Sequence, residues 1–399
     1  SRDGRISTCC IPRVDAGAAI TRTAGSRPSN ATCSASCART TCPDRRRQRL
    51  GSTTCAAAVR ATCGDWLIKA AQEDYMFRWK KLGKVFDPKD LTTASWMHEF
   101  AQSPSVLVMD AYVRVYFCSR PAPGPDGQYL SYISYIDLNR RNLLNIMRVC
   151  DQPVLNLGKY GTFDEFGTYP VSVIRDADEI RAYYAGWTRC ESVPFNAAIG
   201  LAMSRDGGET FQRLGDGPVL SYTPDEPFLL GSPRIRRFNG RWQLWYVAGR
   251  EWRMADGKPE PTYKIRMATS DDGIDWVKLG RDLIADKLGA HECQACPDVT
   301  YRSGRYHMFF SYRDIRNYKS REGGYRIGYA SSPDMLHWQR DDEMVDIQLS
   351  ETGWDSEMVN YPHVFELDGA TYMLYQGNGM GRAGFGLAML ESEGAWAQI

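Results

Sequence analysis

Five prolines divide most of this 399-residue chain into units of almost equal length. They are Pro104, Pro170, Pro233, Pro297 and Pro362, which lie 66, 63, 64 and 65 residues apart, and each introduces a short strand-like segment. A repeat of this length indicates that each unit is one supersecondary module packed against its neighbours. The order of strands within a unit then decides the fold.

An aromatic-rich segment and then a second β-prone segment follow each proline. The first set spans 113–118, 180–186, 242–248, 306–312 and 372–376, and the second spans 132–138, 198–204, 265–270, 327–331 and 385–390. Short alternating strands separated by turn residues are typical of all-β proteins. Four strands in each of five units predict an all-β, five-bladed β-propeller with four-stranded antiparallel blades. We expect each proline to begin an innermost strand, and residues 77–83 to supply the strand that closes the last blade.

Residues 1–65 differ in composition from the rest of the chain. They contain 11 Arg, no Lys and four acidic residues, which gives +7 (11 − 4), against −6 (38 − 44) for residues 66–399. We expect this low-complexity segment to be a disordered or non-native extension with the natural start near Met76, and residues 66–399 to be a catalytic propeller domain. The alternatives are a targeting segment, since the composition is that of a transit peptide, or a separate module.

The composition of the remaining chain also limits its partners. All 47 aromatic residues follow residue 65, and an aromatic-rich, mildly acidic domain argues against nucleic-acid binding. No run of about 18 apolar residues predicts a membrane span. The five later cysteines are expected to be reduced thiols, which favours a cytoplasmic location. We expect no metal and no cofactor, and oligomeric state is left open.

Four of the five units have a glutamate five residues before the proline, namely Glu99, Glu165, Glu292 and Glu357, and Asp164 stands one residue earlier in its unit. Clustered carboxylates have their pKa values pushed apart, so that one serves as proton donor and another as base, and glycoside hydrolysis uses such a pair. We therefore predict that one axial pocket contains Asp164, Glu292 and Glu357 as catalytic carboxylates, with Glu165 beside them. A solvated rim of loop carboxylates is the alternative.

Further polar and aromatic residues beside these acids and at the strand ends are candidates for substrate binding. The arginines, Arg120 among them, suit a carboxylate, phosphate or sulfate, or else form ion pairs between blades. Trp187 suits stacking on a sugar ring, or else belongs to the core. The full predicted set is His98, Glu99, Gln102, Glu165, Trp187, Arg189, Arg250, His291, Arg313, Asp355, Asn360 and Asn378.

Three units contain Ser-x-Asp followed by a turn and an aromatic residue. These are Ser204/Asp206/Phe211, Ser270/Asp272/Trp276 and Ser332/Asp334/Trp338. They resemble the Asp-box hairpins of sialidases, in which the aspartate accepts hydrogen bonds from backbone N–H groups of the turn. We interpret them as structural turns at the edges of blades.

The repeat as a whole resembles the five-bladed β-propeller glycosidases, the superfamily of glycoside hydrolase families 32, 43, 62, 68 and 130. The resemblance covers residues 77–399 and rests on the proline-linked strands and on third strands such as Ile199-Gly200-Leu201-Ala202. The segments 161–164, 353–358 and 384–388 are similar to a bacterial glycosidase-like branch. In arabinanase-like families the catalytic acids lie one or two residues before the inner-strand proline, where this chain has no acidic residue.

The resemblance implies a carbohydrate-active enzyme, and our prediction is a glycoside hydrolase that cleaves a glycosidic bond by carboxylate acid/base catalysis in the axial pocket. Its partner is then a carbohydrate, an oligosaccharide or glycoside. The alternatives are a glycoside phosphorylase or glycosyl-transferring enzyme of the same fold, and a sugar-binding propeller without catalysis.

Overall fold

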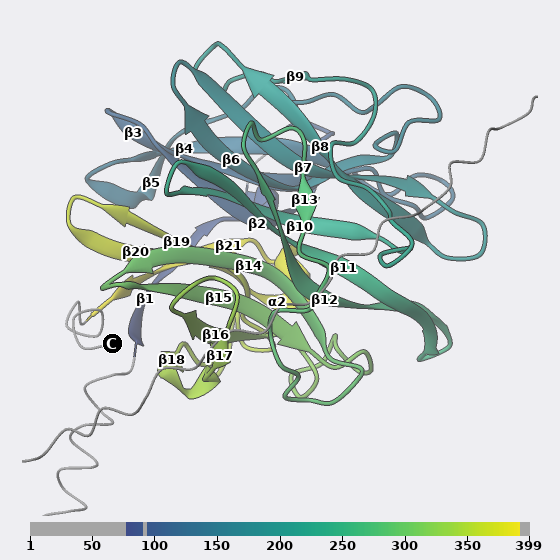
Figure 1. The fold of residues 1–399 in the computed structure, drawn as a ribbon. Helices are drawn as coiled ribbons and strands as arrows, with labels where there is room; N and C mark the ends of the chain where they lie inside the picture. The colour runs from purple at the N-terminus through teal and green to yellow at the C-terminus, as the bar shows by residue number, and fades with distance from the viewer. Residues whose placement is uncertain (1–76, 91–93, 392–399) are drawn as a thin grey trace, which may run out of the picture. The chain divides into compact units, whose positions relative to one another are not determined.

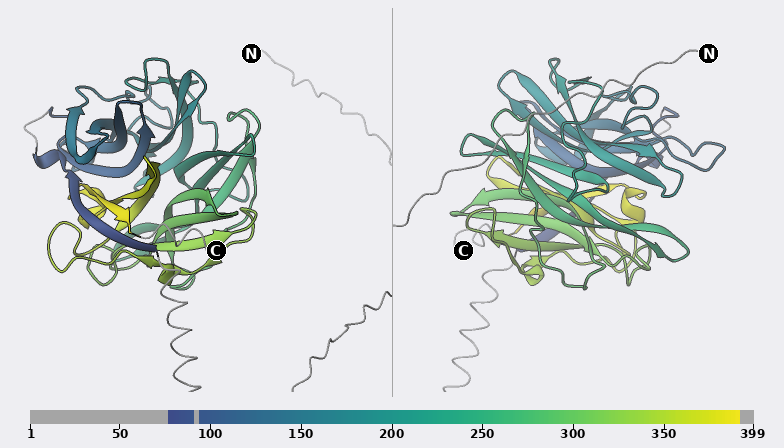
Figure 2. Two further views of the ribbon diagram at one scale, coloured as in Figure 1. Left: turned by 90° about the vertical axis from the view of Figure 1, so that its left-hand side faces the viewer. Right: turned by 45° about the vertical axis from the view of Figure 1, so that its right-hand side comes forward.

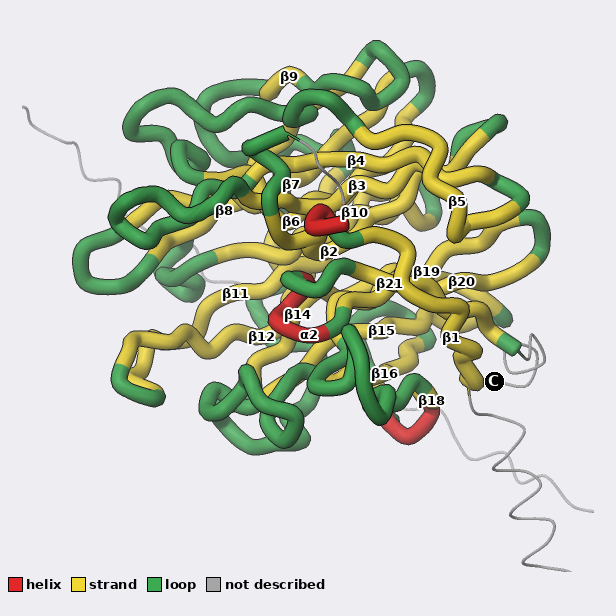
Figure 3. The backbone as a smooth tube through the Cα atoms, turned by 180° about the vertical axis from the view of Figure 1, so that it is seen from behind, coloured by secondary structure: helices red, strands yellow, loops and turns green. Residues whose placement is uncertain are grey.

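Alternating β-branched, aromatic and polar residues form strands through most of the region that the structure describes. The computed structural model describes residues 77–90 and 94–391, so the predictions for residues 1–65 lie outside the described residues. Figure 3 shows how strongly strands predominate, and the helical turns in this region are η1 (Pro88–Asp90), η2 (Asp342–Met344) and α2 (Asn378–Gly381). Within it, no helix is long and apolar enough to cross a membrane.

The strands form five sheets, which confirms the predicted all-β five-bladed propeller (Figure 1). Blade 1 contains β2 (Glu99–Val108), β3 (Tyr112–Arg120), β4 (Tyr132–Asn139) and β5 (Asn142–Val149). Blade 2 contains β6 (Gly167–Asp176), β7 (Glu179–Arg189), β8 (Phe195–Ser204) and β9 (Gln212–Arg213). Blade 3 contains β10 (Leu230–Phe238), β11 (Arg241–Ala255), β12 (Lys258–Ser270) and β13 (Val277–Lys278). Blade 4 contains β14 (Cys293–Arg302), β15 (Arg305–Arg313), β16 (Arg326–Ser332) and β17 (Gln339–Arg340). Blade 5 contains β19 (Asn360–Leu367), β20 (Ala370–Gln376), β21 (Phe385–Leu390), β1 (Phe77–Phe86) and β18 (Val345–Asp346).

The first described strand completes the last blade. β1 pairs antiparallel with β21, with Trp79 opposite Leu390, and β18 pairs parallel with the start of β1. Figure 2 shows the dark blue β1 lying along the yellow strands of blade 5. This confirms the prediction for residues 77–83, and it covers a sheet edge that would otherwise be free to pair with another chain.

The five prolines lie inside the innermost strands, so the prediction that each begins its strand was wrong. Every inner strand has a register shift at its proline, for example between Gly231 and Arg234 in β10 and between Ala295 and Asp298 in β14. Proline has no N–H to donate to the ladder and is therefore tolerated at such a bulge.

Side chains of the inner strands connect each blade to the next around the axis. Each link joins a side chain on one inner strand to the backbone of the following one, and the fifth link joins blade 5 to blade 1. Because side chains satisfy backbone groups that face the axis, the ring closes without leaving buried polar groups unpaired at these positions. The links are Val173 N–H to Ser105 Oγ, Ile235 N–H to Ser172 Oγ, Arg236 Nε to Val299 O, Val364 N–H to Asp298 Oδ2, and Val106 N–H to His363 Nε2, at 2.5–3.3 Å.

The three Ser-x-Asp motifs form the turns that the sequence predicts. In blade 2, Ser204 Oγ donates to Asp206 Oδ1 at 2.7 Å, and the same carboxylate accepts the backbone N–H of Glu209 at 3.0 Å. Burial raises the pKa of Asp206, but hydrogen bonds from the Thr210 and Ser204 hydroxyls and from backbone N–H groups of the turn outweigh it and lower the pKa to about 2. The hairpin also contacts blade 1, because Tyr116 donates its hydroxyl to Gly208 O at 2.8 Å.

Candidate functional site

The innermost strands of all five blades contribute to one cavity at the axis. Its volume is about 360 Å³. The contributions are residues one or two positions before each proline, so the bulges described above shape the floor of this axial pocket. They are Gln102, Tyr169, Gly231, Ser232, Ala295 and Tyr361.

Aromatic side chains from the second and third strands and their loops form much of the pocket wall. They are Tyr129, Trp187, Phe195 and Tyr263. The Trp187 indole is held in place because its Nε1 donates to Ser131 Oγ at 2.7 Å. Gly167 is required beside it, since a Cβ there would lie 1.7 Å from Trp187 Nε1. Trp187 thus lines the pocket, as a residue that binds a sugar face must.

The polar groups on the pocket wall are neutral or positive. Gln102, Gln128 and Arg120 line it, and among the described residues no Asp or Glu does so. Gln102 also donates to Met380 O at 2.5 Å, which fixes the turn of α2 at the pocket edge. The pocket therefore offers hydrogen bonds and a cation but no carboxylate on its lining.

One carboxylate reaches the pocket through a tyrosine. Tyr129 donates its hydroxyl to Glu99 Oε1 at 2.5 Å, and Arg382 Nε donates to Glu99 Oε2 at 3.0 Å. Burial raises the pKa of Glu99, but the hydrogen bonds from Tyr129 and Arg382 outweigh it and hold the pKa below its usual value. Burial and the bond to Glu99 raise the pKa of Tyr129. At neutral pH the pair is therefore a carboxylate and a protonated phenol.

Two of the predicted catalytic carboxylates lie inside blades instead. Asp164 is fully buried, with Arg213 Nε 2.7 Å and the Tyr184 hydroxyl 2.8 Å from Oδ2. Glu292 is also fully buried, and Arg340 Nη1 lies 2.7 Å from its Oε1. The structure contradicts the prediction that these residues line one axial pocket with Glu165 and Glu357. In this conformation neither buried carboxylate can contact a ligand at the axis.

The ion pairs of Asp164 and Glu292 belong to a pattern that recurs in blades 2 to 5. In each of these blades an acid before the inner strand pairs with a basic residue of the fourth strand, and that basic residue lies opposite an alanine of the third strand. In three of the four, a tyrosine hydroxyl of the second strand donates to the same acid, while Phe310 replaces it in blade 4. We call these sets the blade triads: Asp164–Tyr184–Arg213, Glu226–Tyr246–Lys278, Glu292–Phe310–Arg340 and Asp355–Tyr375–Lys81.

Glu357 and Glu165 have different surroundings from the two buried acids. Glu357 is exposed, and its carboxylate has no hydrogen bond or ion pair within residues 77–90 and 94–391. Its backbone N–H donates to Asn378 Oδ1 at 2.8 Å, which places it next to α2 and thus beside the pocket residue Met380. Glu165 accepts the N–H of Gly161 at 2.9 Å and shapes its own loop.

Of the predicted binding residues, Gln102 and Trp187 line the pocket and Glu99 reaches it through Tyr129. The others are engaged elsewhere. Arg189 pairs with Asp126, Arg250 with Asp282, and Asp355 with Lys81, while Arg313 is buried behind Tyr263. His98 and His291 lie on loops before β2 and β14, Asn360 donates to Gly377 O, and Asn378 holds the Glu357 loop.

Several pocket residues were missed from the sequence. Tyr169 and Tyr361 stand directly before prolines, where our prediction considered only acidic residues. Tyr129, Phe195 and Tyr263 lie in or beside the third strands, where nothing in the local pattern distinguishes a pocket residue from a core residue. The signal that would have found Tyr169 and Tyr361 is their place one or two residues before a proline, since those positions of all five inner strands line the pocket.

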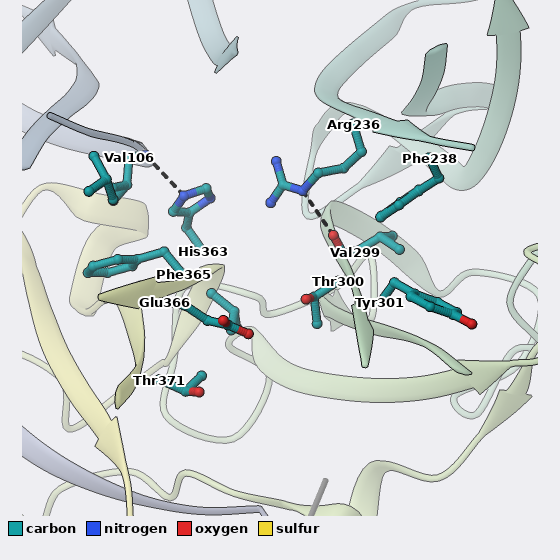
Figure 4. A pocket seen from close by; sticks show the side chains of 12 residues that line it. Val106, Arg236, Phe238, Val299, Thr300, Tyr301, His363, Phe365, Glu366 and Thr371 are labelled. Carbon is teal, nitrogen blue, oxygen red and sulfur yellow. Dashed lines mark hydrogen bonds between the residues drawn. The ribbon is translucent and has the colours of Figure 1, made fainter. Parts of the chain in front are cut away.

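A second cavity of about 360 Å³ opens at the opposite end of the inner strands (Figure 4). Between the two cavities lies a buried cluster in which Asp298 contacts Arg234 at 3.3 Å and His363 at 3.5 Å. Burial holds the pKa of His363 well below its usual value, so the ring is neutral. The cluster closes the axis, and Arg236 on the wall of the second cavity is paired with Asp298.

Comparison with known proteins gives a family and a fold. No family model matches the chain. The uncharacterised protein Rv1502 of Mycobacterium tuberculosis is 35% identical over 315 residues, which cover 79% of this chain and 99% of that protein.

Solved structures support the fold at low sequence identity. A structure described as a glycoside hydrolase is 17% identical with a TM-score of 0.62, covering 82% of this chain and 95% of that one. A GH130 structure, from a family described as mannoside phosphorylases that contains glycoside hydrolases, is 14% identical with a TM-score of 0.60, covering 79% and 94%. The Bombyx mori GH32 β-fructofuranosidase BmSUC1 is 16% identical with a TM-score of 0.53, covering 83% and 66%.

Proposed function

Because this chain belongs to the family of Rv1502 and has the five-bladed fold of glycoside hydrolases and phosphorylases, we propose that it binds a glycosyl unit in the axial pocket and acts on its glycosidic bond. The observation that supports this most is the pocket itself. Five inner strands meet there, and its wall combines aromatic rings with amide and guanidinium donors. Sugars present apolar ring faces and rims of hydroxyl groups, and such a wall complements both.

Proton transfer in this proposal is the role of Glu99 and Tyr129. A sugar oxygen held beside the Tyr129 hydroxyl would exchange a proton with Glu99 through that hydroxyl, because the two protein oxygens are 2.5 Å apart. General acid–base catalysis needs a donor and an acceptor within hydrogen-bond reach of the reacting atom. Glu357, with its free carboxylate beside α2, stays our candidate for the second proton-transfer group.

A second candidate function is sugar binding without turnover. The observation that favours it is that none of the described Asp and Glu residues lines the pocket, whereas hydrolysis commonly uses two carboxyl groups about 5–10 Å apart across the bond.

Binding and turnover of a panel of oligosaccharides and aryl glycosides test both candidates, with Glu99→Gln, Tyr129→Phe and Glu357→Gln beside wild type. The matched control is Glu343→Gln, because Glu343 is an exposed carboxylate of η2. Turnover by wild type that falls roughly 10²-fold or more in Glu99→Gln, with sugar still bound, supports the enzyme. Sugar binding with no turnover supports the second candidate. Absence of any sugar binding overturns both.

A further inference from the structure

We propose that the ligand of the axial pocket carries an anionic group, a carboxylate or a phosphate, that binds Arg120. This inference rests on the proposed function and names the class of its substrate. Arg120 is the last residue of β3 and lines the pocket. Planar guanidinium groups bind carboxylate and phosphate oxygens through two parallel hydrogen bonds.

Aromatic rings hold the Arg120 guanidinium at the pocket wall. Its central carbon lies 4.6 Å from the ring centre of Phe100, 5.4 Å from that of Tyr129 and 5.8 Å from that of Tyr169. Contacts with three ring faces restrict a long side chain that would otherwise be mobile. The cation is thus positioned before any ligand arrives, which lowers the entropic cost of binding.

Arg120 has no carboxylate partner among residues 77–90 and 94–391, and its Nε is buried without a hydrogen-bond acceptor. Its neighbours differ in this respect. Arg382 pairs with Glu99 at 3.0 Å, and Arg189 pairs with Asp126 at 3.1 Å. The charge of Arg120 is therefore left uncompensated, whereas those of Arg382 and Arg189 are neutralised.

A second guanidinium adds to the positive potential. Arg313 is buried and donates to the hydroxyl of the pocket residue Tyr263 at 3.2 Å, and no described carboxylate pairs with it. With no acid on the lining, the fields of the two cations add within the pocket. A buried charge without a partner is costly, and an anionic ligand removes that cost on binding. Neutral hydroxyl groups could hydrogen-bond to the amides of Gln102 and Gln128, so a neutral ligand would not require the cation.

Calorimetric titration with matched probes tests the inference. The probes are galacturonic acid against galactose, glucose 1-phosphate against glucose, and inorganic phosphate alone. The variants are Arg120→Gln, which removes the charge, and Arg120→Lys, which keeps it. Arg148→Gln is the control, since Arg148 lies in the same blade and is paired with Glu209 away from the pocket.

We expect at least one anionic probe to bind wild type 10-fold or more tightly than its neutral partner. The preference should weaken at high salt, disappear in Arg120→Gln, persist in part in Arg120→Lys and be unchanged in Arg148→Gln. Preference for galacturonic acid assigns the anion to a sugar acid, and preference for glucose 1-phosphate or phosphate assigns it to a phosphate.

Equal binding of anionic and neutral sugars, or a preference that survives in a folded Arg120→Gln protein, overturns the inference and leaves the proposed function standing. Binding of inorganic phosphate with no sugar of either kind overturns the proposed function instead.

Discussion

The acids of the blade triads and the lining of the axial pocket are close in the chain but differ in charge balance. Asp164 and the pocket residue Tyr169 are five residues apart, yet Asp164 is buried against a cation while the pocket contains a cation without an acid. In the triads, charge is matched within one blade and serves to hold its strands together. In the pocket, charge is unmatched, which is the condition expected where a ligand supplies the partner.

Blade 1 sharpens this contrast because it lacks a triad. At the corresponding places it has Met97 in the preceding loop, Phe117 in the second strand and Val149 in the fourth, all within one apolar cluster. The same blade supplies Glu99, Gln102 and Arg120 to the pocket region. The blade that departs from the repeat thus supplies the amide and guanidinium groups of the candidate site.

The largest expected effect is the loss of a triad acid. Glu226 pairs with both Arg266 and Lys278 and is 1% exposed. Glu226→Ala leaves the half-buried Lys278 without its acidic partner and the buried Arg266 with Asp282 alone, so we expect a loss of about 3–5 kcal/mol in the free energy of unfolding. Urea unfolding measures it, with the exposed Glu351→Ala as control, expected within about 0.5 kcal/mol of wild type. Equal stabilities for Glu226→Ala and Glu351→Ala would contradict a structural role for the triads.

The next largest effect is a loss of stability at acidic pH, which two buried histidines cause. Burial lowers the pKa of His307 from 6.5 to about 4 and holds that of His363 well below 6.5. Below pH 6.5 these two histidines bind protons in the unfolded chain but stay neutral in the folded protein. The free energy of unfolding therefore falls as the pH drops toward 4. The expected slope is about 1.4 kcal/mol per pH unit for each histidine. Denaturant unfolding at pH 7, 6 and 5 measures it, and a flat profile would contradict the neutral state of these two histidines in the folded protein.

The triads have their own pH dependence, which separates them from the histidines. Burial raises the pKa of Glu226, but bonds from Lys278 and Arg266 outweigh it and lower the pKa below 4.5. The stabilisation is therefore present above pH 4.5 and is lost as the pH falls through the lower folded value. The stability gap between wild type and Glu226→Gln should shrink below pH 4.5. A gap that grows there would show that the sign is wrong.

A smaller, local effect is expected in the pocket. Gly167→Ala places a Cβ 1.7 Å from Trp187 Nε1, so the indole must leave Ser131. Sugar affinity should fall roughly 10-fold, by analogy with the 0.5–1.5 kcal/mol of aromatic contacts, and Trp187→Ala should lose at least as much. Titration with a bound sugar measures both. Unchanged affinity in both variants would exclude Trp187 from the binding surface.

The smallest effect is expected at the blade edge. Asp206 is an exposed turn residue, so Asp206→Ala should cost no more than about 1 kcal/mol and leave sugar binding unchanged. Thermal unfolding and titration together check this. A loss of sugar binding in Asp206→Ala would show that the hairpin affects the pocket, and would contradict the assignment of a purely structural role to the blade edge.

The fold could be predicted from the sequence to a greater extent than the site. The repeat of prolines and aromatic strands is local, and it predicted the blades and the closing strand at residues 77–83. The acids of the blade triads also stand at similar places, five to seven residues before a proline, but their partners are not local: Lys81 lies 274 residues from Asp355. A regular row of carboxylates therefore has the same pattern whether it faces a ligand or a cation of its own blade. Arg120 shows the reverse, since its lack of a partner is visible only after folding.

The most direct test of the axial pocket as the ligand site is a crystal structure of the protein soaked with the tightest-binding sugar from the titrations. We expect the sugar in the pocket, with one ring face on Trp187 and an anionic group within hydrogen-bond distance of the Arg120 guanidinium. A sugar bound instead in the small cavity beside Asp164 and Arg213, or in the cavity between Arg236 and His363 at the opposite end of the axis, would contradict the assignment.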